Sequence, residues 1–411
     1  MQFKDLQLNK PILKAVADKN YENPTLIQKE TIPLILEKKD VIASAQTGTG
    51  KTAAFALPIL QLLFDKQDAS KKGKKIRALV VSPTRELAQQ IDENFKTYGK
   101  YTNLKTAVVY GGTSIEAQME ILKKGVDILI ATPGRLLDLF KQNIVNLANI
   151  ETLVLDEADL MLDMGFIEDV LKIEKSCPKQ KQILLFSATM PNKVVQLANT
   201  ILNQPEVVDV TTSSVVTKKV HQTLYYVPKP NKIELCLHLL RNTIRGSVII
   251  FRRTKFGVDK LENALLKNKY QVGSIHGDKS QTLRQEALKS FKKREVNILI
   301  ATDVAARGID IKNVDAVINF DLPNLPEIYV HRIGRTGRAG SEGVSYSFCS
   351  ADEKDYVKNI EKLMQKNIFV EENHAYPLDP KAKPEVHKKQ GSKHKKGRKS
   401  EASKKKKKRW Y

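Results

Sequence analysis

Short apolar runs alternate with amphipathic stretches through most of the chain. In the first half the apolar runs lie at 41–43, Ile76–Ser82, Thr106–Tyr110, Val126–Ala131, Thr152–Leu155 and Gln182–Phe186. Runs of this length with few polar positions are typical of strands buried on both faces, and the stretches between them have the spacing of amphipathic helices. The pattern therefore predicts an α/β fold, with a parallel sheet covered by helices on both faces.

The second half repeats this alternation. Its predicted strands are His221–Val227, Ser247–Phe251, Gln271–Ile275, Asn297–Ala301, Ala316–Phe320 and Ser345–Cys349. Between the halves, Thr211–Thr217 is polar and poor in helix formers, which is typical of a linker. The expected organisation is a leading segment 1–29, a first domain 30–209, a linker 210–219, a second domain 220–368 and a basic, disordered tail 369–411.

A glycine-containing loop follows the first apolar run. It reads Ala45-Gln46-Thr47-Gly48-Thr49-Gly50-Lys51-Thr52 and precedes the apolar stretch 53–57. Between a strand and a helix, such a loop wraps backbone N–H groups around phosphate oxygens, and the helix N-terminus adds positive partial charge. Lys51 would then reach the β- and γ-phosphates, and the Thr52 hydroxyl would ligate Mg²⁺. An ordinary glycine turn is the alternative.

Two acidic residues, Asp156 and Glu157, follow the predicted strand Thr152–Leu155. A carboxylate at the end of a neighbouring strand can hold Mg²⁺ opposite the phosphates, and the next carboxylate can polarise the attacking water. We therefore expect Asp156 to bind the metal and Glu157 to orient the water, although acidic residues also favour an ordinary helix N-terminus. Together with the phosphate loop, they predict a nucleoside triphosphatase.

Length, charge and cysteine content narrow the class of protein. The 411 residues suit two domains better than one. Cys177, Cys236 and Cys349 lack the spacing of a disulfide framework or a zinc site, which favours a reducing, cytoplasmic location. No apolar run reaches the roughly 18 residues that a membrane span needs, so we expect no membrane partner.

The net charge of +23 is concentrated at the C-terminal end. Residues Lys381–Tyr411 contain 13 lysines, 2 arginines and 2 glutamates, which amounts to +13. Their low apolar content predicts disorder, and their charge favours a polyanionic partner such as a nucleic acid. A solubilising tail and a nuclear import signal are the alternatives.

Residues 156–159 read Asp-Glu-Ala-Asp, and from about Phe3 to about Met364 the chain resembles the DEAD-box ATP-dependent RNA helicases, of the bacterial type with a basic tail. The resemblance implies two tandem RecA-like domains, ATP and Mg²⁺ as cofactors, and RNA as the partner. Ribosomal RNA or a ribonucleoprotein is a candidate partner of the tail. The implied reaction is ATP hydrolysis coupled to the separation of short RNA duplexes or the remodelling of RNA–protein complexes.

The resemblance also implies the residues that bind ATP. Gln28 would read the adenine edge, because an amide can donate and accept at once, with Phe3 beside it and Asp310 at the ribose. Arg335 and Arg338 match the arginine fingers that neutralise charge on the γ-phosphoryl group. The expected catalytic residues are Lys51, Asp156, Glu157, Arg335 and Arg338, and the expected ATP contacts are Phe3, Gln28, the loop 45–52 and Asp310.

Several loops at predicted strand ends carry arginines, hydroxyls and glycines, which suit a sugar–phosphate strand. By the resemblance, the expected RNA contacts are Arg85, Gly111, Thr132, Arg135, Thr254, Arg284, Thr302 and Gly308. Four further residues match those that couple hydrolysis to strand separation: Asp159, Ser187, Thr189 and His331. The segment 187–189 would also suit a plain helix N-cap.

Two other functions use similar features. A DNA translocase can have the same two-domain core, but the Gln28 element and the 156–159 motif argue against it. An RNA-binding clamp without turnover would have lost catalytic groups, whereas Lys51, Glu157, Arg335 and Arg338 are intact. RNA-stimulated phosphate release would separate these three functions. The sequence makes no prediction about the oligomeric state or the particular RNA.

Overall fold

The computed structural model describes residues 1–45, 48–66, 75–210, 220–306, 311, 314–337, 342–379 and 382. Five residues that the sequence assigns to ATP or RNA lie outside the described residues, namely Gln46, Thr47, Gly308, Asp310 and Arg338. The same holds for residues 211–219 of the expected linker and for almost all of 380–411.

The first half of the chain contains a seven-stranded sheet with its helices. Its strands are β1 (Val41–Ser44), β2 (Ala78–Val81), β3 (Thr106–Val109), β4 (Ile128–Ala131), β5 (Thr152–Leu155), β6 (Gln182–Ser187) and β7 (Glu206–Asp209). Its helices are η1 (Phe3–Leu6), α1 (Lys10–Ala17), α2 (Leu26–Leu36), α3 (Lys51–Asp65), α4 (Arg85–Tyr98), α5 (Ile115–Lys123), α6 (Pro133–Lys141), α7 (Ala158–Asp163), α8 (Ile167–Ser176) and α9 (Asn192–Ile201).

The second half contains another sheet of seven strands. Its strands are β8 (Val220–Tyr226), β9 (Val248–Arg252), β10 (Val272–Ile275), β11 (Ile298–Thr302), β12 (Ala316–Asn319), β13 (Gly343–Cys349) and β14 (Phe369–Val370). Its helices are η2 (Lys229–Asn231), α11 (Lys232–Asn242), α12 (Lys255–Lys267), α13 (Gln281–Lys292), α14 (Asp303–Ala306), α15 (Pro326–Ile333), η3 (Ala351–Glu353) and α16 (Lys354–Met364).

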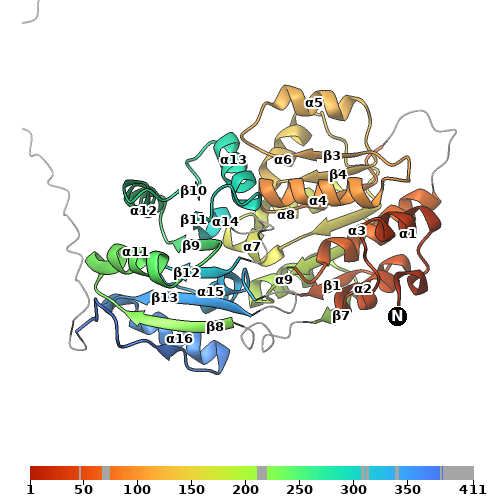
Figure 1. The fold of residues 1–411 in the computed structure, drawn as a ribbon. Coiled ribbons are helices and arrows are strands. Elements are labelled where there is room, and N and C mark those ends of the chain that lie inside the picture. Colours follow the sequence, from red (N-terminus) through yellow and green to blue (C-terminus); the bar gives the residue numbers. More distant parts are fainter. Residues whose placement is uncertain are drawn as a thin grey trace, which may run out of the picture.

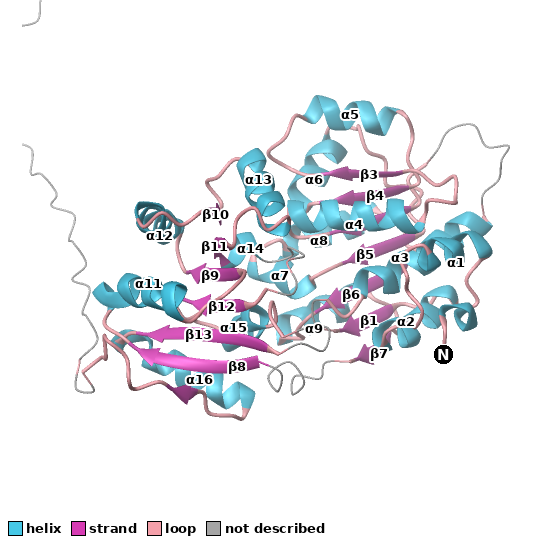
Figure 2. Ribbon diagram, viewed as in Figure 1, coloured by secondary structure: helices cyan, strands magenta, loops and turns pink. Residues whose placement is uncertain are grey.

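Both sheets are parallel and share one strand order. The first runs β3-β4-β2-β5-β6-β1-β7 and the second β10-β11-β9-β12-β13-β8-β14, so each strand of the second sheet takes the place of the strand numbered seven lower. Figures 1 and 2 show the two sheets side by side, with helices packed on their faces. The prediction of two tandem α/β domains is therefore confirmed, and the two domains repeat one topology.

Most apolar runs in the sequence correspond to buried strands, whereas β8 exposes His221. In β2, β4, β5 and β6 every residue is buried, because helices cover both faces of the sheet. The rings of Phe55 on α3 and Phe186 on β6 lie 5.2 Å apart on one of these faces. Among the described residues, no helix combines the length and the apolar character that crossing a membrane requires.

Two edge strands, β7 and β14, were not predicted. The β7 strand exposes three of its four residues, so it lacks the apolar run of a buried strand. The β14 strand lies in the segment assigned to the tail, and this assignment is wrong for residues 369–379. Phe369 and Val370 pair with β8, and the N–H of Leu378 donates to the carbonyl of Tyr226 at 2.9 Å.

A buried ion pair stabilises the second half where three of its strands end. The ammonium of Lys232 lies 2.6 Å from Glu353 Oε2 and also donates to the carbonyls of Phe320 and Phe348. Both charged side chains are about 3% exposed. Glu353 Oε1 accepts from Arg253 and from the N–H of Leu322. This network therefore fixes the ends of β9, β12 and β13 relative to α11.

We predict that Glu353→Ala destabilises the second half by on the order of 3–5 kcal/mol, because it removes the carboxylate that contacts the buried ammonium of Lys232 and leaves only Asp321, at 3.8 Å, as its counter-charge. Chemical denaturation followed by circular dichroism would measure the loss. Asp355→Ala is the matched control, because Asp355 pairs with Lys358 on the surface, where both side chains are more than three-quarters exposed. Equal denaturation midpoints for the two variants would show that Glu353 contributes no more to stability than a surface carboxylate does.

Candidate active site and nucleic-acid interface

The phosphate loop leads from β1 into α3, as predicted. Helix α3 begins at Lys51, and Gly50 precedes it with a φ of +97°. A Cβ atom at Gly50 would lie 2.3 Å from Nε2 of Gln28, so both the backbone angle and the close contact require glycine. Gln28 Nε2 donates to the carbonyl of Gly50 at 3.1 Å, and its Oε1 accepts from the N–H of Thr25 at 2.9 Å. Gln28 therefore holds the loop directly.

Three charged residues meet beside this loop. Lys51 Nζ lies 2.9 Å from Glu157 Oε1, and both side chains are less than 10% exposed. Asp156 is 2% exposed. Burial and the charge of Glu157 raise the pKa of Asp156 to about 7, and Lys51 offsets only part of this effect. Burial lowers the pKa of Lys51, but the neighbouring carboxylates outweigh burial, so its pKa is raised and it stays charged.

The strand order explains how these residues meet. The sequence interpretation placed the carboxylates on a strand next to the phosphate loop, but β6 lies between β1 and β5. The end of β6 carries Ser187, which therefore lies between the loop and the carboxylates. Glu157 has φ 52° and ψ 55°. A left-handed conformation is uncommon for a residue other than glycine and is typical of functional sites.

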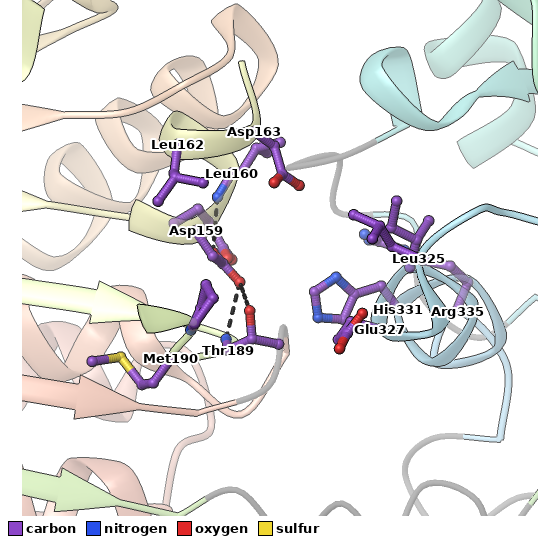
Figure 3. Close-up of a pocket in the computed structure, with 13 residues that line it drawn as sticks. Asp159, Leu160, Leu162, Asp163, Thr189, Met190, Leu325, Glu327, His331 and Arg335 are labelled. Carbon is purple, nitrogen blue, oxygen red and sulfur yellow. Dashed lines mark hydrogen bonds between the residues drawn. The ribbon is translucent and has the colours of Figure 1, made fainter. Parts of the chain in front are cut away.

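Asp159, Ser187 and Thr189 form one hydrogen-bonded cluster. Asp159 Oδ2 accepts from the N–H of Thr189 at 2.9 Å and from its hydroxyl at 2.8 Å (Figure 3). The hydroxyl of Ser187 accepts from the N–H of Asp159 at 3.2 Å and donates to the carbonyl of Thr189. Burial raises the pKa of Asp159, but Lys51, His331 and these hydrogen bonds outweigh burial and lower it.

A cavity of about 420 Å³ separates this cluster from the second half. Figure 3 shows His331 and Arg335, from the end of α15 and the turn after it, across the cavity from Asp159 and Thr189. Glu157 also lines this cavity. The structure thus brings three of the four predicted coupling residues, Asp159, Thr189 and His331, to one cavity, and Arg335 and Glu157 line it too. The fourth, Ser187, is fully buried.

A second cavity, of about 580 Å³, lies along the phosphate loop. It is lined by many of the predicted ATP contacts, namely Phe3, Gln28, Gly48, Thr49, Gly50, Lys51 and Thr52, and by the predicted catalytic residues Asp156 and Glu157. Ala45 is fully buried instead, and its N–H donates to the carbonyl of Ser187 at 3.0 Å. Glu157 lines both cavities, so this residue lies between them.

A groove of about 280 Å³ contains most of the predicted RNA contacts that the structure describes. Arg85, Gly111, Thr132 and Arg135 line it from the first half, and Arg284 lines it from the second. Thr254 and Thr302 are not among its lining residues. Thr254 caps α12, where its hydroxyl accepts from the N–H of Gly257 at 3.1 Å, and Thr302 ends β11.

The two halves touch at this groove through polar side chains. Arg284 Nη2 lies 2.9 Å from Glu86 Oε1, and Gln281 donates to the same carboxylate oxygen at 3.0 Å. Gln281 also accepts from Arg85 at 3.3 Å. A further hydrogen bond joins Gln285 and Gln89, where α13 lies against α4 (Figure 1).

Sequence reasoning missed some of these residues. Glu86 and Gln281 were not among the predicted site residues, because a contact between residues 195 positions apart leaves no local pattern. Gly112 was also missed. With a φ of +76° it leaves room for Arg85, whose guanidinium would lie within 2.5 Å of an added Cβ, whereas the predicted Gly111 has no comparable constraint.

Two RecA-like domains that share a nucleotide cleft and a groove define a two-domain, nucleotide-dependent helicase. The family model DEAD/DEAH box helicase matches residues 25–197, and the model Helicase conserved C-terminal domain matches residues 231–340. The chain is 46% identical over 365 residues to the ATP-dependent RNA helicase CshA of Limosilactobacillus reuteri, which covers 88% of this chain and 72% of that protein. The chain therefore belongs to the DEAD-box ATP-dependent RNA helicases.

Solved structures support the same assignment. Dbp5 of S. cerevisiae bound to RNA and ADP BeF3 has a TM-score of 0.81 and 31% identity, over 90% of this chain and 95% of that one. Mss116p bound to ssRNA and AMP-PNP has a TM-score of 0.82 and 33% identity, over 92% and 80%. Because these matches cover both halves, the two domains are placed here much as they are in those complexes.

We predict that Asp156→Asn changes how stability depends on pH. The folded pKa of Asp156 lies above its unfolded value, so the folded state binds the proton more tightly and ionisation destabilises it as pH rises towards 7. Without nucleotide or metal, the stability of Asp156→Asn relative to wild type should increase by about 2 kcal/mol between pH 5.5 and 8. Thermal unfolding at both pH values measures this difference. A difference in stability that is the same at both pH values would contradict the raised pKa of Asp156.

Proposed function

We propose that this chain hydrolyses ATP in the cleft along the phosphate loop and uses closure of its two domains to separate short RNA duplexes. The observation that carries this proposal is the position of Glu157 between two cavities. On one side lies the phosphate loop with Lys51, and on the other lie His331 and Arg335 of the second domain. Hydrolysis therefore requires groups from both domains, which makes it sensitive to their closure.

Recognition of the nucleotide begins at the leading segment. The amide of Gln28 already binds Gly50 and Thr25, and it retains one N–H and one carbonyl lone pair for a ligand. These groups suit the donor and acceptor on one edge of adenine. Since Gln28 also holds the phosphate loop, adenine binding and phosphate binding share one side chain.

The charged cluster beside the loop suits phosphates and a divalent cation. Asp156 Oδ1 is buried and has no hydrogen-bond partner among the described residues, which fits a metal ligand. Asp156 and Thr52 would hold Mg²⁺, which neutralises charge on the phosphate oxygens when bound. The ammonium of Lys51 would leave Glu157 and bind the γ-phosphate, because the phosphate is the more highly charged partner. Glu157 is then placed to orient the attacking water.

Arg335 would complete the site from the second domain by neutralising charge on the γ-phosphoryl group. Arg338 is assigned the same role by resemblance. Asp159 and Thr189 link this region to Ser187 and the β6 end through the hydrogen bonds described above. A change at the γ-phosphate would therefore reach the wall of the cavity that faces His331 and Arg335 of the second domain.

The groove between the domains is the proposed path of single-stranded RNA. Arg85, Arg135 and Arg284 line it, and Arg135 Nη2 donates to the carbonyl of Thr113 at 3.1 Å, which holds that guanidinium in place. Because residues from both domains line the groove, it is complete only when the domains are closed. The nucleotide and the RNA thus favour the same closed arrangement, and RNA should stimulate hydrolysis.

We predict that Glu157→Gln lowers RNA-stimulated phosphate release by at least about 100-fold, because the carboxylate that orients the water is lost. ATP and RNA should still bind, so the variant should accumulate as a closed complex. Phosphate release and RNA affinity would be measured with RNA and with DNA of the same sequence. Glu120→Gln, on the exposed face of α5, is the control.

The outcomes separate the possible functions. Stimulation of the wild type by DNA as strongly as by RNA would favour a DNA translocase. Phosphate release that neither strand stimulates would favour an RNA clamp. Near-normal turnover of Glu157→Gln would assign the water to another residue.

We predict that the Glu86–Arg284 ion pair couples RNA binding to hydrolysis. Glu86→Gln and Arg284→Gln should each raise the RNA concentration for half-maximal ATPase activity by about tenfold, because the pair is almost fully buried. The double variant should be no worse than the worse single variant, since both changes remove one interaction. Affinity for ATP without RNA should stay unchanged. Effects that multiply would show that the two residues act independently.

A further inference from the structure

Phe256 is the most exposed large apolar side chain among the described residues. Its exposed fraction is 74%, although it belongs to the first turn of α12. Single exposed apolar side chains are common on protein surfaces, so exposure alone carries little weight. Phe256 differs from the other exposed apolar residues in its position, in the rigidity of its backbone and in the ammonium beside its ring.

The turn that carries Phe256 adjoins the groove between the domains. It follows β9, and the strand order β10-β11-β9 puts the loops after these three strands on one edge of the second sheet. Lys255 Nζ pairs with Asp278 at 2.6 Å, and the neighbouring Gly277 lines the groove. In the view of Figure 1, α13 lies between α12 and the first domain. Phe256 is not among the residues that line the groove, but its neighbour Lys255 contacts Asp278, which follows the lining residue Gly277 in the chain.

A helix cap and side-chain contacts also hold the backbone of this turn in place. The hydroxyl of Thr254 caps it through Gly257 N–H, and a Cβ at Gly257 would lie 2.7 Å from the guanidinium of Arg252. That guanidinium stacks 4.0 Å from the ring of Phe320 and pairs with Asp321 at 2.9 Å. The backbone beneath Phe256 is thus held by packing and by charge, so little ordering is needed before the ring can bind a ligand.

One cationic group lies against the exposed ring. Lys255 Nζ lies 5.2 Å from the centre of the Phe256 ring, and the same ammonium pairs with Asp278. An aromatic face beside an ammonium suits a strand that has phosphates on its backbone and flat bases. A paired base inside a duplex has both faces covered by its neighbours, whereas an unpaired base can stack on a side chain.

We propose that Phe256 is a base-stacking contact for single-stranded RNA where the strand leaves the groove. This inference rests on the proposed path of RNA across the domains. The groove offers contacts to the RNA backbone, and Phe256 would add a contact to a base. Stacking would retain a base that has left its duplex and would favour single strands over double strands. Because every base has an aromatic face, the contact would tolerate any sequence.

The test measures binding of a labelled 12-nucleotide single-stranded RNA to the full chain, with a non-hydrolysable ATP analogue. Phe256→Ala should weaken binding by about 5- to 100-fold, the range that loss of an aromatic stacking partner produces. Phe256→Trp should bind as wild type does, and Phe256→Leu should not restore binding. Leu266→Ala, on the same helix and half-exposed, is the matched control and should bind normally.

A second probe separates stacking from a disturbed backbone site. A ribose–phosphate strand without bases should bind wild type and Phe256→Ala equally. If Phe256→Ala weakens binding of this strand as well, or if Phe256→Leu restores binding of normal RNA, stacking is refuted. Normal RNA binding by Phe256→Ala also refutes stacking, and a protein partner would then be the alternative ligand of the ring. If the wild type itself fails to bind single-stranded RNA, the proposed function fails rather than this inference alone.

Discussion

The proposed nucleotide site depends on keeping Lys51, Asp156 and Glu157 together at less than 10% exposure. Three charges can be buried only if each is neutralised by a neighbour, by a proton or by a ligand. Lys51 pairs with Glu157, and burial raises the pKa of Asp156 to about 7. A triphosphate with its cation would replace these internal partners. The groups that pair with one another are thus the same groups that would bind the ligand.

The parallel sheet makes this cluster possible. It places the ends of β1, β6 and β5 next to one another, and each end contributes one part of the site. The second domain repeats the same strand order, yet in place of a phosphate loop it contributes His331 and Arg335 from the end of α15. In the proposed function, one copy of the topology would therefore bind the nucleotide, and the other would contribute groups to its γ-phosphate.

The contacts between the domains at the groove are polar. Glu86, Gln281 and Arg284 form a small hydrogen-bonded set, and no apolar core among the described residues spans both domains. Polar interfaces of this kind can open without exposing large apolar surfaces to water. Closure can then follow the binding of nucleotide and RNA. The rigid turn under Phe256 suggests that base contacts complement the backbone contacts of the groove.

The sequence alone determined the α/β class, the repeated alternation and the residues of the phosphate loop, because these depend on local patterns of burial and on short motifs. It also indicated which groups belong to the nucleotide site. Tertiary structure alone decided that β6 separates β1 from β5 and that Glu86 meets Arg284. It also placed β14 in the second sheet. Strand order and contacts between distant residues arise from packing across the whole domain, and no local pattern records them.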